Sequence, residues 1–85
     1  MATMPTPEQS ARKILWIYVN HFGCYAGHTL SKSNLMVCQE YGLTEEDQNK
    51  GMAYAINQTW LEPTDNEEFR LTGEGFRELN PFKFR

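Results

Sequence analysis

The segment from Leu43 to Leu79 constrains the fold of this 85-residue chain more than any other part. It opens with Thr44 and three consecutive acidic residues, a pattern typical of the capped start of a helix. Apolar residues then recur at helical spacing, which predicts a helix over about 44–60. The expected inward face consists of Met52, Ala55, Ile56 and Thr59, with Trp60 and Leu61 closing it.

A β-hairpin is predicted directly after this helix. Two short apolar segments, Leu61–Pro63 and Phe69–Leu71, are separated by the five polar residues 64–68. The Asp-Asn pair within them is a turn signal between strands. Proline lacks a backbone N–H, so Pro63 places the first strand at a sheet edge. Residues 72–79 then predict a short closing helix.

The first half of the chain predicts a long helix from about Pro7 to Phe22. Thr6, Pro7 and Gln9 form the pattern of a capping box with proline in the first helical position. The buried face is expected to consist of Ala11, Ile14, Leu15, Tyr18 and Phe22. Trp16, Ile17 and Val19 lie off this stripe. Two explanations stay open: a small domain wraps its central helix, or the Trp16 side makes a dimer or partner contact.

A short strand near His28–Leu30 and a second helix are predicted next. Ser31 or Ser33 can cap this helix, and Gly42 supplies the left-handed conformation that ends helices. Its apolar positions are Leu35, Met36, Cys38 and Tyr41. Gly51 lies within the following helix, where glycine lowers helix stability by about 1 kcal/mol relative to alanine. We expect it to permit a close approach of the second helix.

Composition indicates one small globular domain at 6–80, with short tails at 1–5 and 81–85. Hydrophobic residues make up 40% of the chain, charged residues 22%, and the net charge is −3. This balance is too apolar for a disordered chain. The longest apolar run is far shorter than the roughly 20 residues of a membrane span, and the first residues do not resemble a signal peptide. We expect a soluble, cytoplasmic protein with no membrane partner.

The order of these elements resembles the winged-helix family of helix-turn-helix domains. The segment Trp60-Leu61-Glu62-Pro63, a polar loop, and then Phe69-Arg70-Leu71-Thr72-Gly73-Glu74-Gly75-Phe76 is similar to the end of such domains. Tyr41-Gly42-Leu43-Thr44 is similar to their turn between the second and third helices. The resemblance implies an α+β, mostly helical fold. It would have a three-helix core, a two- or three-stranded antiparallel wing and a short C-terminal helix.

The resemblance also implies where such a domain would meet a partner. Residues 45–60 would be the recognition helix, whose outward face enters the DNA major groove in DNA-binding members. Its outward residues would be Glu46, Asn49, Lys50, Ala53, Tyr54 and Asn57. The wing tip would be Asp65, Asn66, Glu67 and Glu68.

The charge of this surface departs from that of a DNA-binding surface. DNA affinity comes largely from lysine and arginine at the phosphates. Here the third helix and the wing carry six carboxylates, at Glu45, Glu46, Asp47, Asp65, Glu67 and Glu68, against the single ammonium of Lys50. Only Lys32 and Arg70 are otherwise placed to reach a DNA backbone. We expect these carboxylates to share one side of the molecule and to form a single negative field.

Two functions follow as expectations. The first is a small non-enzymatic module that binds a protein partner through the acidic third helix and wing. The alternative is a DNA-binding transcriptional regulator, dimeric through the first helix, in which Asn49, Tyr54 and Asn57 read base edges.

Metal binding and catalysis have weaker support in the sequence. His21, Cys24, His28 and Cys38 are the residue types of a zinc site, but their spacing lacks the close pairs that typify one. Cys38 is expected in the core and Cys24 as an exposed thiol. No orienting third group accompanies a Cys–His pair. We therefore expect no enzyme activity, no cofactor and no small-molecule substrate.

Overall fold

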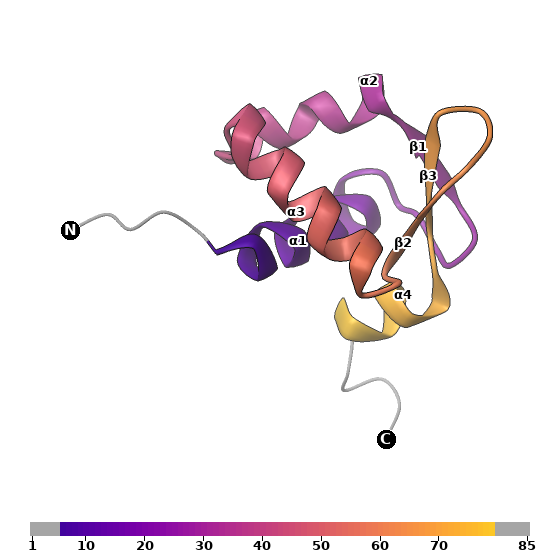
Figure 1. Ribbon diagram of the computed structural model, residues 1–85. Helices are drawn as coiled ribbons and strands as arrows, with labels where there is room; N and C mark the ends of the chain where they lie inside the picture. The colour runs from indigo at the N-terminus through magenta and orange to yellow at the C-terminus, as the bar shows by residue number, and fades with distance from the viewer. Residues whose placement is uncertain (1–5, 80–85) are drawn as a thin grey trace.

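The computed structural model describes residues 6–79, so the expected tails at 1–5 and 81–85 lie outside the described part (Figure 1). Within it, helices surround one side of a small antiparallel sheet, which confirms the α+β class. The elements are α1 (Pro7–Trp16), β1 (Thr29–Ser31), α2 (Lys32–Leu35), α3 (Glu45–Asn57), β2 (Leu61–Pro63), β3 (Glu68–Leu71) and α4 (Gly73–Leu79). A π-helical turn at Ile17–His21 extends α1, and a 3-10 helix at Met36–Tyr41 extends α2.

The first helix begins as predicted but ends differently. The Thr6 hydroxyl accepts a hydrogen bond from the Gln9 N–H, and the Gln9 side chain accepts one from the Thr6 N–H. After Trp16 the helix widens into the π-helical turn, which adds a residue per turn and changes which side chains face inward. Ile17 is fully buried, although its position off the apolar stripe suggested exposure.

The second helix has the predicted extent but is mostly 3-10. Of the two candidate caps, Ser31 is the one used, because its hydroxyl accepts from the Asn34 N–H at 3.3 Å. The chain leaves this helix at Gly42, whose φ of 94° is the left-handed conformation expected there.

The third helix is shorter than predicted. Thr44 caps it by accepting from the Asp47 N–H at 3.0 Å. It ends at Asn57, and Thr59 has a φ of 62°, so Thr59 is exposed instead of inward. Ile56 is only half-buried. The inward face consists of Asp47, Gln48, Gly51, Met52 and Ala55.

Helices α1 and α3 pack closely along the middle of the molecule, where α3 crosses α1 (Figure 1). Gly51 lies at the point of closest approach. A Cβ at Gly51 would stand 2.8 Å from the Ser10 Cβ and 3.0 Å from the Ala11 nitrogen. The expectation that Gly51 admits the second helix is therefore wrong, since the first helix occupies that space.

The three strands form one antiparallel sheet in the order β1-β3-β2. Leu30 of β1 pairs with Phe69, and Leu61 of β2 pairs with Leu71. Strand β2, which contains Pro63, lies at an edge as expected. The hairpin turn is shorter than predicted, because Glu68 belongs to β3.

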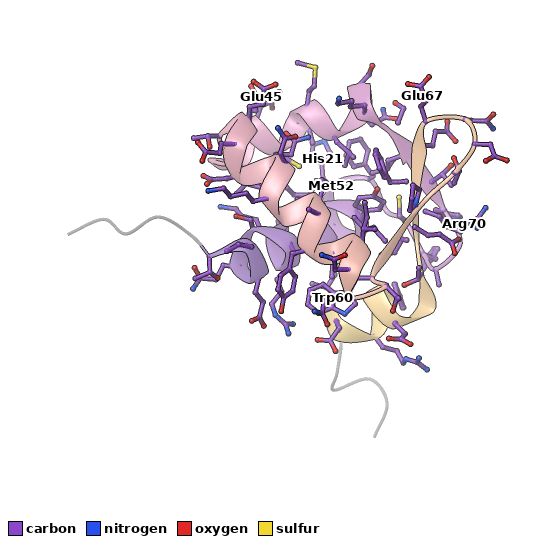
Figure 2. All side chains as sticks on the ribbon, in the orientation of Figure 1. His21, Glu45, Met52, Trp60, Glu67 and Arg70 are labelled. Atoms are coloured by element: carbon purple, nitrogen blue, oxygen red, sulfur yellow. The ribbon has the colours of Figure 1, made fainter. Side chains whose placement is uncertain are left out.

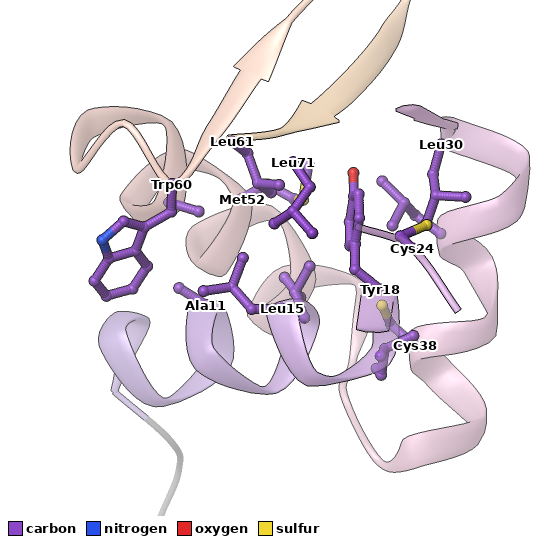
Figure 3. Packing of buried hydrophobic residues seen from close by; sticks show 14 of the residues in the cluster. Ala11, Leu15, Tyr18, Cys24, Leu30, Cys38, Met52, Trp60, Leu61 and Leu71 are labelled. Carbon is purple, nitrogen blue, oxygen red and sulfur yellow. The ribbon is translucent and has the colours of Figure 1, made fainter. Parts of the chain in front are cut away.

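The hydrophobic core joins the helices to the sheet (Figure 3). Tyr18 lies fully buried at its centre, and its hydroxyl donates to the Phe69 carbonyl at 3.0 Å. Trp60 closes one end beneath the guanidinium of Arg12, 5.0 Å from the ring centroid. Arg12 also pairs with Glu78 of α4 at 3.0 Å, which ties α4 to α1. Among residues 6–79 no helix has the length and apolar character needed to cross a membrane.

Candidate functional site

The side of α3 that faces away from α1 is the surface that the resemblance singled out. Glu46, Lys50, Ala53 and Asn57 are exposed there. Tyr54 is half-buried, with its ring tilted against Trp60 at a centroid distance of 5.6 Å. Asn49 is exposed as well, but it lies at the rim of a groove beside α2.

Three of the six carboxylates on α3 and the wing are engaged within the domain. Glu46 pairs with Lys50 at 3.0 Å, one helical turn away. Asp47 is buried and belongs to the cap of its own helix. Glu68 accepts from the Thr29 hydroxyl at 3.0 Å. The charge these groups present to a partner is therefore smaller than the sequence count indicates.

The other three carboxylates, Glu45, Asp65 and Glu67, are exposed and make no ion pair within residues 6–79. Figure 2 shows Glu45 at the start of α3 and Glu67 on the hairpin turn, well apart, with α2 between them in the view. The expectation of one pooled negative field is therefore wrong. The structure has two smaller acidic groups, because α3 and the hairpin turn diverge at this end of the molecule.

The cations near this surface differ in availability. Arg70 pairs with Glu62 across the hairpin, and Lys50 pairs with Glu46. Lys32, at the start of α2, is exposed and makes no ion pair in the described part of the chain.

A groove between α2 and α3 lies beside these residues. It consists of two adjoining pockets of about 270 Å³ and about 260 Å³ that share Lys32, Gln48 and Asn49. The first, called the polar lobe below, is also lined by Ser33, Met36, Gln39 and Glu45. The second, called the apolar lobe, is also lined by Leu35, Met52, Ala53, Ile56 and Phe69.

Gln48 occupies an unusual position at the junction of the two lobes. The residue is only 8% exposed, yet its side-chain amide forms no hydrogen bond with any residue in 6–79. Every side-chain nitrogen or oxygen in the described part that is sealed from solvent has a partner. The Gln48 amide is therefore open to the groove that it lines. Sequence reasoning missed this residue, although a polar residue four positions before Met52 on an inward stripe is a detectable signal.

Trp16 contributes to a separate aromatic surface at the end of the first helix. Its side chain is 43% exposed and lies edge-on to Tyr41, with ring centroids 5.6 Å apart. The Tyr41 hydroxyl lies 2.8 Å from Nδ1 of His21. A dimer or partner contact at Trp16 stays a prediction.

The four residues considered for zinc are dispersed in the structure. His21 contacts Tyr41, whereas His28 accepts from the Tyr25 N–H at 3.1 Å. Within residues 6–79, histidine, cysteine and carboxylate side chains form no cluster of three or more suited to a metal ion. Both cysteines are buried reduced thiols beside Tyr18 (Figure 3). The expectation of an exposed Cys24 is wrong, because its loop folds back onto the core.

Burial of these thiols predicts a loss of stability at alkaline pH. Burial raises the pKa of Cys38 to about 11 and raises the pKa of Cys24 as well. Unfolded thiols titrate near pH ~8.5, so above that pH the unfolded state releases protons that the folded state keeps. We expect the free energy of unfolding to fall between about pH 9 and 11, by up to ~1.4 kcal/mol per pH unit for Cys38, and Cys24 adds to the fall in the same direction.

Urea unfolding at several pH values measures this loss. Cys38→Ala is expected to lower the absolute stability through its small cavity but to flatten the decline with pH. An equally steep decline in the variant would show that Cys38 is not its source.

Comparison of the chain with protein-family models, curated proteins and solved structures found no match. Fold and site together define a small α+β domain with an exposed helix, a hairpin beside it and a groove between α2 and α3.

Proposed function

We propose that this chain is a non-enzymatic, winged-helix-like module that binds a basic protein partner through α3 and the hairpin. The order of the elements and the sheet order β1-β3-β2 support the winged-helix part of the proposal. The short strand between α1 and α2 joins the hairpin as a third strand and holds it against the helices. The hairpin then corresponds to the wing, and α3 to the recognition helix.

The observation that carries the protein-binding part is the set of unpaired carboxylates. Glu45 at one end of the surface, and Asp65 and Glu67 on the wing turn, have no cationic partner within residues 6–79. A partner that spans both acidic groups with lysine or arginine gains attraction at each, which speeds encounter and sets orientation. The net charge of −3 acts in the same direction.

DNA binding is the second candidate function, and specific observations favour it. Glu46 and Asp47 are engaged within α3, so the recognition helix repels phosphate less than its sequence indicates. The exposed amides of Asn49 and Asn57 have the chemistry to read adenine. Against it, Lys32 alone among the nearby cations is unpaired in the described part, and one phosphate contact holds a duplex weakly.

Charge substitutions separate the two functions. We expect a fluorescent lysine-rich model peptide to bind with an affinity of about 100 µM or tighter at low salt, by fluorescence anisotropy. The triple variant Glu45→Gln, Asp65→Asn, Glu67→Gln should weaken this binding by about tenfold, because it removes the unpaired charges. Random duplex DNA should not bind measurably at about 50 mM salt.

The control is Glu40→Gln, which removes an exposed carboxylate from the 3-10 helix outside α3 and the wing. It should leave peptide binding almost unchanged. Equal weakening by the control, or no effect of the triple variant, would contradict the proposed surface. Micromolar affinity for DNA with a steep salt dependence would contradict the protein-binding proposal and support DNA binding as the function.

A further inference from the structure

The groove between α2 and α3 has the features of a ligand site, and its lining shares Glu45, Asn49 and Ala53 with the proposed protein-binding face of α3. We propose that it binds a small monocarboxylic acid with an apolar body. The apolar body would fill the apolar lobe, and the carboxylate would lie at the junction of the two lobes, between Lys32 and Gln48.

The apolar lobe suits a hydrocarbon or aryl group. Its walls are Leu35, Met52, Ala53, Ile56 and Phe69, which come from α2, α3 and β3. Ile56 and Phe69 are only half-buried, so apolar surface is left uncovered there. The two lobes together fall within the size range of pockets that hold small ligands.

The junction supplies the polar contacts that a carboxylate needs. Gln48 is more than nine-tenths buried, and its amide lacks a hydrogen-bond partner among residues 6–79. No side-chain atom sealed from solvent lacks a partner in the described part, so the Gln48 amide opens into the groove and is free to hydrogen-bond a ligand there. Lys32 lines both lobes and makes no ion pair in the described part of the chain. A carboxylate there would accept from the Gln48 amide and pair with the Lys32 ammonium.

The remaining polar lining restricts the class of ligand further. Glu45 lines the polar lobe beyond the junction, so a second anionic group on the ligand would meet a carboxylate. This favours monocarboxylates over dicarboxylates and phosphate esters. Met36, which is 60% exposed, lines the polar lobe and can adjust to ligands of different length.

Titrations followed by amide chemical shifts test the proposal with 4-phenylbutyrate and octanoate as probes. We expect shifts at the Gln48 side-chain amide and at the backbone amides of Lys32 and Met52. Affinities should be roughly millimolar or tighter, and the matching primary amides should bind about tenfold more weakly because they lack the charge. The dicarboxylate suberate should also bind more weakly than octanoate.

Two lysine variants provide a matched comparison. Lys32→Gln should weaken carboxylate binding by about fivefold or more and abolish the preference over the amide. Lys13→Gln removes an exposed lysine from α1, outside the groove, and it should leave carboxylate binding unchanged. Gln48→Met should weaken binding while keeping the apolar contacts of the side chain. Lys32 is exposed, so its variant keeps the test valid if Gln48→Met fails to fold.

Several results would overturn the proposal. One is a set of chemical-shift changes confined to residues outside the groove. Another is equal affinity for a carboxylic acid and its primary amide. The third is no chemical-shift change with either probe at about 10 mM. If an N-acetylated apolar tripeptide amide bound in the groove more tightly than the carboxylates, the groove would be a site for a protein segment instead of a small acid. The ligand titrations use chains that keep Glu45, Asp65 and Glu67, so failure of the ligand site is distinguishable from failure of the proposed partner surface.

Discussion

Replacing Gly75 with alanine is expected to destabilise the domain by about 3 kcal/mol or more. A Cβ at this buried position in α4 would overlap the Trp60 carbonyl oxygen and stand 3.1 Å from Cδ1 of Leu71. The carbonyl cannot readily move, because it accepts from the N–H of Thr72 at 3.1 Å and from its hydroxyl at 3.0 Å. Relieving this overlap therefore requires α4 to move away from the segment between α3 and β2, where Trp60 closes the core.

Thermal and urea unfolding measure this effect. For a domain of this size each 1 kcal/mol lowers the melting temperature by roughly 4–8 °C, so a fall of about 12 °C or more is expected. Gly73→Ala is the matched control in the same helix, because a Cβ there meets no atom within 4 Å. It should change stability by less than about 0.5 kcal/mol. Equal effects of the two substitutions would show that α4 does not pack against Trp60 in this way.

Gly51→Ala is expected to destabilise the domain by about 2 kcal/mol. Two effects oppose each other at this position in α3. Helix propensity favours alanine by roughly 1 kcal/mol. The added Cβ, however, would stand 2.8 Å from the Ser10 Cβ and 2.9 Å from the Ser10 carbonyl carbon. Because two of the three nearest atoms, the Ser10 carbonyl carbon and the Ala11 nitrogen, are backbone of α1, the helices must move apart, and we expect the packing loss to exceed the propensity gain.

A double-mutant cycle with Ser10→Gly isolates this contact. Removing the Ser10 Cβ relieves the nearest overlap but leaves the backbone atoms, so part of the loss should be recovered. The double variant should therefore be less destabilised than the sum of the single variants, by about 0.5–1 kcal/mol. A stabilising Gly51→Ala would contradict the close approach of α1 and α3.

Local signals in the sequence predicted the elements well. Thr6, Ser31 and Thr44 each cap the helix that their side chains suggested, and Gly42 takes the expected left-handed conformation. These interactions join residues at most a few positions apart, so their geometry follows from nearby side chains. The hairpin and its edge strand were predictable for the same reason.

The candidate site was predicted less well, because its properties depend on which elements meet. The carboxylates were counted as one field, yet Asp47 is buried in its cap and Glu46 is paired with Lys50. The groove could not be located in advance, since its walls come from α2, α3 and β3. Gln48 carried a detectable signal as a polar residue on an inward stripe, but a sequence pattern does not show whether a buried amide has a partner.

The sequence by itself determined the helix caps, the place of the hairpin, most of the core and the net charge. Only the tertiary structure decided that Gly51 faces α1, that Cys24 is buried, that β1 joins the hairpin, and that the Gln48 amide opens into a groove. The physical reason is the distance along the sequence over which each kind of interaction acts. Capping and turn hydrogen bonds are made within a few residues, whereas packing, desolvation and charge pairing are set by segments that only folding brings together.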